Sequence, residues 1–188
     1  RECVDLVVAK EENISLVRRM SGGSAIYSDR GQLTYCIVAD EHELPGTAED
    51  VFESVCGALI GALSTFGIEA EHHRPNDVLV RGRKISGSAQ VRRLGCIAQH
   101  GTILVDTDLG LMSRALLSAK RPRDGMTTMA LELGQAPPME DVARAVVDGF
   151  RRTFGVTMAE GRLTERESGE IDHLLETKYS TERHTFQR

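Results

Sequence analysis

Two passages of the sequence combine residue types that could hold an anionic or acyl ligand. The first is a run rich in glycine and serine that follows two arginines, Arg18-Arg19-Met20-Ser21-Gly22-Gly23-Ser24-Ala25-Ile26-Tyr27. Glycine lets a backbone approach a ligand closely, and the N–H groups of such a turn can hold an anion. Arginine adds charge suited to phosphate or carboxylate. A glycine hairpin with incidental arginines explains the same residues equally well.

The second passage surrounds a lysine. The residues from Asn76 to Ala89 predict a strand, an exposed tight turn at 81–83, and a second strand. Lys84 enters the second strand, and small residues that leave room for a ligand follow it: Ser86, Gly87, Ser88 and Ala89. An ammonium group there is a point charge for an acyl carbonyl or a phosphate. An edge lysine beside a solvated turn is the ordinary alternative, and the small residues shift the balance only modestly.

The remaining candidate groups are weaker. His100 precedes Gly101 inside a later strand run, where an imidazole could enter a pocket or make a structural hydrogen bond. His72 and His73 lie before a proline without further ligands at metal-binding spacing, so a solvated loop is favoured. The glycine-rich run is neither a Walker loop nor a GxGxxG dinucleotide motif.

Composition limits the class of protein. A length of 188 residues fits one domain, and a formal charge of −5 argues against general affinity for nucleic acid. No stretch approaches 18 apolar residues, so no membrane span is expected. The cysteines, at positions 3, 36, 56 and 96, show no zinc spacing and are predicted to be buried free thiols in a reducing cytoplasm. The chain starts at Arg1 rather than methionine, which suggests that upstream residues are missing.

Short strands and amphipathic helices must position these candidates. Five runs are β-branched and bounded by turn residues: Cys3–Ala9, Leu33–Ala39, Val78–Val80, Lys84–Gln90 and Cys96–Val105. The clearest helix runs from Thr47, which can cap it, to about Phe66 before Gly67. Strands and helices alternate without a steady βαβ rhythm. The sequence therefore predicts an α+β fold with a mixed or antiparallel sheet.

Three further helices follow from apolar periodicity. The first starts at Asp108 and places Leu109, Met112, Leu116 and Leu117 on one face. The second follows Pro137-Pro138, uses Val142, Ala145, Val146, Phe150 and Phe154, and stops at Gly155. The last opens with a capping box of Thr164 and Glu167, and is predicted to bury Ile171, Leu174 and Leu175.

Taken in order, these passages resemble the lipoate–protein ligase family. Its pattern reads RRxSGGGxVxHDxG, then NDV…GRKISGSA, then HGT(L/I)L with an acidic-Leu pair, and it stands here as Arg18–Gly31, Asn76–Ala89 and His100–Leu109. Thr127-Thr128 is similar to the adenylate-covering loop of the family, and Lys178-Tyr179 to its closing KY motif. The resemblance covers nearly the whole chain, and three linked motifs are far more specific than any one of them.

The resemblance implies mixed or antiparallel sheets flanked by helices, the fold of biotin ligases and of the catalytic domain of class II aminoacyl-tRNA synthetases. It also implies two half-reactions, in which lipoate and ATP give lipoyl-AMP and the lipoyl group then passes to a lysine of a carrier domain. Lys84 is the implied catalytic residue, because its charge would offset the negative charge that builds at the carbonyl and the α-phosphate. Asp77 is expected to hold Mg²⁺. The implied lipoate- and ATP-binding residues are Arg19, Ser21, Gly22, Gly23, Ser24, Ala25, Ile26, Tyr27, Asn76, Asp77, Lys84, Gly87, Ala89, His100 and Gly101.

The resemblance also implies partners and a domain organisation. Residues 1–188 match one large catalytic domain, with an N-terminal segment missing and the small C-terminal accessory domain absent. The expected partners are lipoyl carrier domains, either 2-oxoacid dehydrogenase E2 or glycine cleavage H protein, and a separate small accessory ligase domain. No nucleic acid or membrane partner is expected, and the location is cytoplasmic. Departures from the family pattern are Ser24, Ser28, Gln32 and His184-Thr185.

Two other functions remain open. An octanoyl- or lipoyl-transferase of the same superfamily moves its acyl chain through a cysteine thioester, which requires a thiolate close to the lysine. The loop Gly67–Asp77, where some of those enzymes carry that cysteine, contains none, and Cys96 is the nearest in sequence. A non-catalytic relative that binds a small ligand or a carrier is the other alternative, although the presence of Lys84 argues against it.

Overall fold

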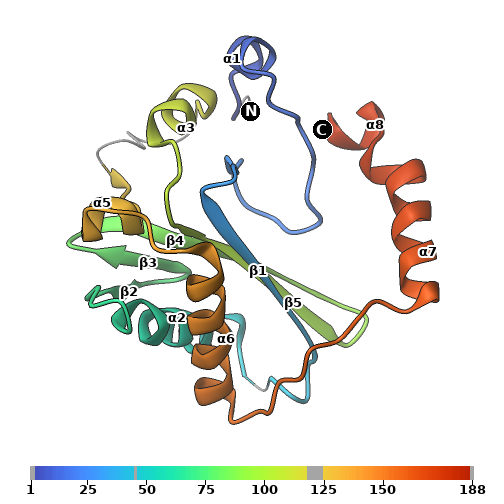
Figure 1. Cartoon of the computed structure of the whole chain (residues 1–188). Coiled ribbons are helices and arrows are strands. Elements are labelled where there is room, and N and C mark those ends of the chain that lie inside the picture. The colour runs from blue at the N-terminus through green and yellow to red at the C-terminus, as the bar shows by residue number, and fades with distance from the viewer. Residues whose placement is uncertain (1–2, 45, 118–124, 187–188) are drawn as a thin grey trace.

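One antiparallel sheet organises the molecule (Figure 1). The computed structural model describes residues 3–44, 46–117 and 125–186. The strands are β1 (Gln32–Asp40), β2 (Glu71–His73), β3 (Asp77–Val80), β4 (Arg83–Arg93) and β5 (Cys96–Leu104), in the order β1-β5-β4-β3-β2. Each pairing between neighbouring strands is antiparallel, with a register shift in the β3–β4 pair between Val78 and Leu79. The predicted α+β fold is confirmed, and its sheet is antiparallel.

Two long helices, α2 (Ala48–Ser64) and α6 (Met139–Phe154), pack against each other and against one side of the sheet (Figure 1). Thr47 accepts a hydrogen bond from the Asp50 amide, and the Asp50 carboxylate accepts one from the Thr47 amide, so α2 starts with a capping box. The predicted span from Thr47 to about Phe66 is therefore confirmed to within two residues. Gly149 of α6 touches the backbone of Ala58, which brings the two helices close together.

The core lies between these helices and the sheet. Its fully buried side chains come from every second residue of the strands and from one face of each helix, including Val55, Leu59, Ile85, Ile97, Ile103 and Val142. The two rings of Tyr35 and Phe150 pack at a centroid distance of 5.5 Å across the layer boundary. A mostly aliphatic core is thus sufficient to fix the sheet that carries the candidate site.

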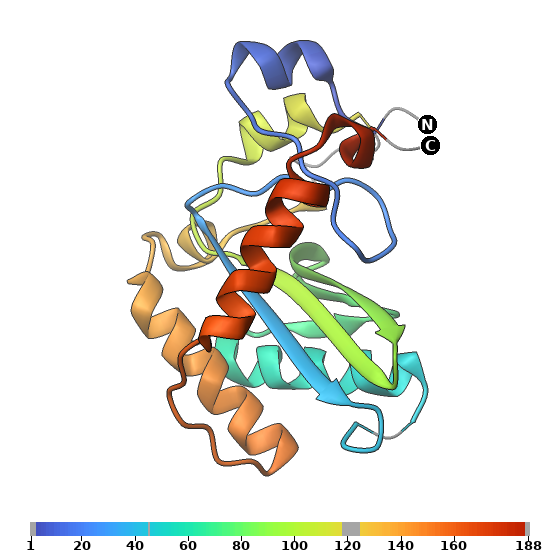
Figure 2. The same cartoon turned by 90° about the vertical axis from the view of Figure 1, so that its right-hand side faces the viewer.

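Short helices and a C-terminal arm complete the chain (Figures 1 and 2). They are α1 (Leu6–Glu11), α3 (Leu109–Ala115), α5 (Met129–Leu133), α7 (Glu165–Leu174), the π-helical turn η1 (Leu175–Tyr179) and α8 (Glu182–Thr185). The arm is the segment from α7 to α8, and Figure 1 shows it on the other side of the sheet region from α2 and α6. Within the described residues, no helix has the length and apolarity needed to cross a bilayer.

Two of the predicted elements are wrong or displaced. Cys3–Ala9 is not a strand, because the Asp5 carboxylate accepts hydrogen bonds from the amides of Val7 and Val8 and thereby starts α1. Within the described residues, this segment forms one isolated antiparallel bridge, between Val4 and Leu116. The helix after Asp108 also ends earlier than its apolar residues suggest, and Leu117 lies outside it and is exposed.

The burial predictions at the C-terminus and at the cysteines also need correction. The Thr164–Glu167 capping box forms as predicted, but α7 buries no residue: Ile171 and Leu175 are about half exposed. Among the cysteines only Cys56 is buried, whereas Cys36 and Cys96 are exposed. The apolar face of α7 was misassigned because periodicity identifies an apolar face without showing what covers it, and the cysteines because a free thiol was assumed to be buried.

Candidate active site

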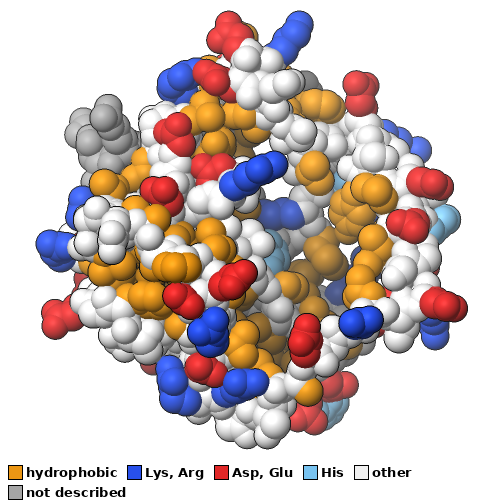
Figure 3. All heavy atoms as spheres, in the orientation of Figure 1, with side chains coloured by type: hydrophobic (Ala, Val, Ile, Leu, Met, Phe, Trp, Pro, Cys, Tyr) orange, Lys and Arg blue, Asp and Glu red, His pale blue; other side chains and the backbone are white. Residues whose placement is uncertain are grey.

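A cleft of about 660 Å³ lies between the glycine-rich loop and the strands β3, β4 and β5. Hydrophobic side chains surround a hollow on the face shown in Figure 3, between the arm and the rest of the molecule. Of the residues predicted from sequence, the cleft is lined by Arg19, Gly22, Gly23, Ser24, Ala25, Ile26, Tyr27, Asn76, Asp77, Lys84, Gly87, Ala89, His100 and Gly101. The remaining one, Ser21, is buried beside the cleft. The fold thus gathers in one place residues that lie up to 82 positions apart, between Arg19 and Gly101.

Lys84 is the second residue of strand β4, and its side chain pairs with Asp77 of β3. Its Nζ is 2.6 Å from the Asp77 Oδ1, and both side chains are only partly exposed, at 34% and 26%. A Cβ at Gly87 would lie 2.5 Å from the Lys84 Cε and Nζ, so a glycine at this position leaves the space that the lysine fills. The ammonium is therefore held at the cleft by a carboxylate that a more strongly anionic substrate could replace.

The glycine-rich loop is held by its own arginine. The Arg19 guanidinium donates to the Ser21 Oγ at 2.8 Å and to the Ser24 carbonyl at 3.0 Å. Gly23 has a φ of 104°, and a Cβ there would lie 2.8 Å from the Arg19 Nη2. The left-handed backbone therefore favours glycine at this position, and a side chain there would also displace the Arg19 guanidinium.

A hydrogen bond joins this loop to the sheet. The Ser21 Oγ lies 2.6 Å from the His100 Nε2, on the strand β5. Burial and the neighbouring Arg19 lower the pKa of His100 below its ordinary value, which favours the neutral imidazole. Because Arg19 already donates to Ser21, the serine hydroxyl is free to donate its proton to the His100 Nε2. The histidine therefore holds the loop in place over the sheet.

Asn76 and Asp77 differ in their surroundings. The Asn76 side-chain amide donates to the Ser88 carbonyl, and the Ser88 amide donates to the Asn76 carbonyl at 3.1 Å, so Asn76 fixes the edge of β4. Asp77 offers one carboxylate, and within the described ranges no cluster of three or more His, Cys, Asp or Glu could hold a metal. Mg²⁺ is commonly bound by one or two carboxylates together with substrate phosphates. These residues fit a magnesium ion that enters with a nucleotide.

Sequence reasoning did not assign several residues to the cleft. Its apolar part includes Leu104, Met112, Leu116 and Met126, and its further lining includes Phe52, Gln90, Thr102 and Gly125. Ser86 and Ser88, which were expected to leave room for a ligand, also line the cleft. Met112 and Leu116 were predicted to form an apolar helix face but not to line the cleft. The same residues of α3 and its C-cap pack in a hydrophobic cluster and also line the cleft. Tyr35 lies behind Gly101, where a Cβ would approach its hydroxyl to 2.4 Å. Only the strand register brings Tyr35 there.

No cysteine occurs among the described residues that line the cleft. Cys96 pairs with Arg93 at the far end of the β4–β5 ladder, about 30 Å along the strand from Lys84 at 3.3 Å per residue. Cys36 pairs with His100 in the β1–β5 register; the residue is exposed as a whole, but partial burial raises the pKa of its thiol. Burial raises the pKa of Cys56 to about 12. Cys96 is thus the nearest cysteine to Lys84 in sequence, whereas Cys36 is the one paired with a residue that lines the cleft.

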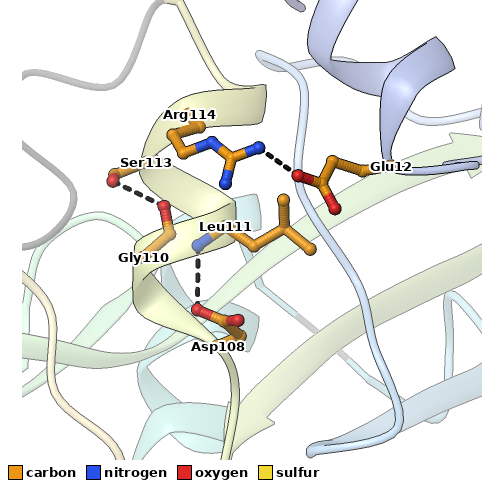
Figure 4. A pocket seen from close by; sticks show the side chains of 6 residues that line it. All are labelled: Glu12, Asp108, Gly110, Leu111, Ser113 and Arg114. Atoms are coloured by element: carbon orange, nitrogen blue, oxygen red, sulfur yellow. Dashed lines mark hydrogen bonds and ion pairs between the residues drawn. The ribbon is translucent and has the colours of Figure 1, made fainter.

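A second hollow lies between α1 and α3 (Figure 4). The Arg114 guanidinium pairs with the Glu12 carboxylate there, and Asp108 accepts a hydrogen bond from the Leu111 amide as the N-cap of α3. Burial, followed by the charges of Asp29 and Asp108, raises the pKa of the nearby Tyr27. Because Arg114 pairs with Glu12 and Asp108 caps α3, these polar groups are already satisfied, and the Arg114–Glu12 pair connects the end of α1 to α3.

Similarity to known proteins decides the family. The family described as "Lipoyl protein ligase A/B catalytic domain" matches residues 1–151. The chain belongs to this family. It is therefore an enzyme of the group that contains lipoate ligases and octanoyltransferases, and lipoylation by acyl transfer is the chemistry of the group.

Individual relatives agree with this assignment but differ in reaction. An octanoyltransferase LipM from Symbiobacterium thermophilum is 32% identical, over 94% of this chain and 75% of the relative. The structure resembles a lipoate-protein ligase A bound with ATP, with a TM-score of 0.89 and 27% identity over 98% of this chain and 76% of the other. It also resembles a chain of a bipartite lipoate protein ligase and E2 lipoyl domain system from Thermoplasma acidophilum, with a TM-score of 0.87 and 28% identity over 98% and 75% of the two chains.

A more distant neighbour bears only on the fold. A biotin protein ligase from Aquifex aeolicus has a TM-score of 0.55 and 18% identity over 66% of this chain and 53% of the other. The expected likeness to the biotin ligase fold is therefore confirmed. Catalytic roles for the residues in the cleft stay predictions.

Proposed function

We propose that this chain activates lipoate with ATP and transfers the lipoyl group to a carrier lysine. In the first step a lipoate carboxylate oxygen attacks the α-phosphate, which gives lipoyl-AMP and pyrophosphate. In the second step the lysine amine of the carrier attacks the acyl carbonyl, forms an amide, loses a proton and releases AMP. The observation that carries the proposal is a cleft lined by Lys84 and the glycine-rich loop, and by no cysteine among the described residues.

Lys84 would act on the charge that develops in both steps. Negative charge builds on the α-phosphate oxygens during adenylation and on the acyl oxygen during transfer. The Lys84 ammonium, paired with Asp77 at 2.6 Å, is a preorganised cation beside that position. A bound nucleotide would compete with Asp77 for the ammonium and leave the carboxylate for magnesium. The magnesium ion would offset charge on the phosphates when bound.

The two ends of the cleft suit the two parts of the substrate. Gly22, Gly23 and Arg19 line the cleft together, and a glycine-rich turn beside a guanidinium is suited to bind an anion. Leu104, Met112 and Leu116 supply apolar surface for an alkyl tail. The lipoate carboxylate would lie between them, close to Lys84.

The partners belong to the same proposal. The Thermoplasma acidophilum neighbour is half of a bipartite ligase and was studied with an E2 lipoyl domain. We therefore include a lipoyl carrier domain, either an E2 or an H protein, as acceptor, and a small accessory ligase domain supplied as a separate chain. The cytoplasm is the proposed location, because the cysteines would remain reduced there.

Lipoate-dependent exchange between ATP and pyrophosphate tests the proposal. The wild-type chain, alone or with an accessory domain, should catalyse the exchange, and Lys84→Ala should reduce kcat by roughly 100-fold or more, since a preorganised charge is lost. Lys10→Ala, an exposed lysine on α1, is the matched control and should match the wild type. The absence of exchange under both conditions, with a folded wild type, contradicts the proposal.

A second candidate function is octanoyl transfer through an enzyme thioester, favoured by the 32% identity to an octanoyltransferase LipM. A thiolate would attack the octanoyl carrier thioester, release the carrier thiol, and form an acyl-enzyme that a lysine amine then attacks, which regenerates the thiol. Cys36, which pairs with His100, is the thiol to examine first. Mass spectrometry after incubation with an octanoyl carrier should then show an octanoyl adduct that Cys36→Ser abolishes. Cys96→Ser is the control.

A further inference from the structure

A carboxylate on α5 is buried although it carries a charge. The side chain of Glu132 is 2% exposed. Its Oε1 accepts hydrogen bonds from the Arg83 Nη2 at 2.7 Å and the Thr127 Oγ1 at 2.5 Å, and its Oε2 pairs with Arg81. Burial alone would raise the pKa of Glu132, but the Thr127 hydroxyl and the two guanidinium groups outweigh it and lower the pKa. Glu132 is therefore ionised and fully partnered.

The partners of Glu132 belong to two different parts of the chain. Arg81 and Arg83 flank the β3–β4 turn, which was interpreted as a solvated tip from sequence. Thr127 belongs to the segment that precedes α5, and Thr128 caps that helix by accepting from the Leu131 amide at 3.1 Å. One carboxylate thus joins the turn before Lys84 to the segment before α5.

That segment replaces β5 beside the catalytic lysine. The β4–β5 pairing ends at Ser86 opposite Ile103, so β5 does not reach Lys84. Instead, Lys84 forms a parallel bridge with Met126, and its carbonyl accepts from the Thr127 amide at 2.9 Å. Gly125 and Met126 also line the cleft. Thr127 therefore connects the two residues: its amide donates to the Lys84 carbonyl, and its hydroxyl donates to Glu132.

We propose that Glu132 is a positioning residue for Lys84. It acts through Thr127 on the backbone of the lysine and on the adjacent cleft wall, and it does not touch the substrate. This inference rests on the proposed function in so far as Lys84 is the catalytic group. It extends that function to a side chain outside the cleft, 48 residues further along the sequence.

Electrostatics explains why a carboxylate suits this place. One anion can bind two guanidinium groups and a hydroxyl at once, which an apolar side chain cannot do. Removing the charge leaves Arg81 and Arg83 facing each other and releases the Thr127 hydroxyl. A shift of about 1 Å at a reacting group can cost roughly 100-fold in rate. A change at Glu132 is therefore expected to reach Lys84.

The experiment is a double-mutant cycle on pyrophosphate exchange with the full chain and, where needed, its accessory domain. Glu132→Gln keeps the shape and removes the charge, and Thr127→Val removes the hydroxyl. Each variant should lower kcat/KM for ATP by roughly 10- to 100-fold. The kcat/KM of the double variant should be no lower than that of the less active single variant, since both substitutions remove the same contact. Asp148→Asn, which breaks an exposed pair with Arg151 on α6, should match the wild type.

A second measurement does not depend on activity. Amide hydrogen exchange at Thr127, whose N–H donates to Lys84, should be at least 10-fold faster in Glu132→Gln than in the wild type. Wild-type kinetics in Glu132→Gln, additive effects in the cycle, or unchanged exchange at Thr127 would each overturn the inference. A wild-type chain without pyrophosphate exchange would overturn the proposed function, whereas the Thr127 amide would still report on the positioning.

A third set of variants distinguishes positioning from simple stabilisation. The triple variant Arg81→Met, Arg83→Met and Glu132→Leu replaces the buried carboxylate and its two partly exposed guanidinium partners by apolar groups, so that no buried charge is left without a partner. Its melting temperature should stay close to that of the wild type while its turnover stays low, because Thr127 still lacks its acceptor. Recovery of turnover together with stability would show that Glu132 only stabilises the fold, and would overturn the inference.

Discussion

Among individual residues, the contact between Ser21 and His100 has a clear dependence on protonation. In the tautomer with an unprotonated Nε2, the neutral imidazole accepts a hydrogen bond from the Ser21 hydroxyl, while Arg19 donates to the serine oxygen. Protonation of His100 would place a second cation beside Arg19 and remove the acceptor. Burial, which disfavours the charged form, and the neighbouring charge of Arg19 lower the pKa of His100. The loop over the cleft is therefore most firmly held when His100 is neutral.

This arrangement predicts a pH dependence of stability. The pKa of His100 in the folded state lies below the unfolded value of about 6.5, so the unfolded chain takes up the proton first as the pH falls. The contribution of His100 to the free energy of unfolding is thus complete above pH 6.5 and decreases as the pH falls below that value. Chemical denaturation across pH 5 to 8 should show this loss in the wild type and a smaller one in His100→Gln.

The exposed His173 on α7 provides the comparison for that measurement. His173→Gln should retain the pH dependence of the wild type. An identical pH dependence in His100→Gln would contradict the proposed role of the imidazole.

The partnerships of single residues were only partly predictable from the sequence. Arg19, Lys84 and His100 could be selected because their neighbours were small or glycine-rich, and the fold brings them to one cleft. Arg81 and Arg83 could not be assigned a role, because their partner Glu132 lies 51 and 49 residues away. A local sequence window shows a charge and its turn, but not a distant acceptor.

Among elements, long periodic segments were predictable and short ones were not. The span of α2 followed from a 3.6-residue period over five turns with a cap at Thr47. The run Cys3–Ala9 is too short for a period to decide, and the hydrogen bonds of Asp5 made it a helix. The apolar face of α7 was predicted, but its exposure was not, because burial depends on elements that are remote in sequence.

The contact between α2 and α6 leads to a prediction about two glycines. A Cβ at Gly149 would lie 2.4 Å from the Ala58 carbonyl oxygen, so Gly149→Ala must push the helices apart. We expect a loss of about 1–3 kcal/mol of stability, which exceeds the gain of about 1 kcal/mol in helix propensity. Gly57→Ala on α2 has no atom within 4 Å and should stabilise by about 0.5–1 kcal/mol.

Chemical denaturation of both variants compares packing with propensity directly. If Gly149→Ala were as stable as Gly57→Ala, the helices would have space for a Cβ at Gly149, which would contradict the close approach to the Ala58 carbonyl oxygen. The α2–α6 layer shares its core with the sheet that carries the cleft, and Phe52 of α2 lines the cleft, so a displacement there should also reduce turnover in Gly149→Ala but not in Gly57→Ala.

For the molecule as a whole, packing is unevenly distributed. The layers formed by α2, α6 and the sheet share one core, whereas α7 contributes no buried residue. The arm is linked to the glycine-rich loop by Arg18, whose Nε donates to the carbonyls of His184 and Thr185 at 3.0 and 3.1 Å. Tyr179 of the closing KY motif packs edge-on against His184 at a centroid distance of 5.1 Å. The arm therefore reaches the loop of the cleft through α8.

This distribution predicts two levels of protection against amide hydrogen exchange, a low one in α7 and a high one in α6. Amides of α7 should exchange with solvent at least 10-fold faster than those of α6, which buries Val142, Val146 and Phe150, because local opening of α7 exposes little apolar surface. Arg18→Ala should accelerate exchange in α8 and leave α6 unchanged. Equal protection of α7 and α6 would contradict this prediction. Ile171 and Leu175 are about half exposed in the single chain. If α7 exchanges slowly only at high protein concentration, a second molecule that covers these side chains provides the protection, so the measurement is repeated at several dilutions.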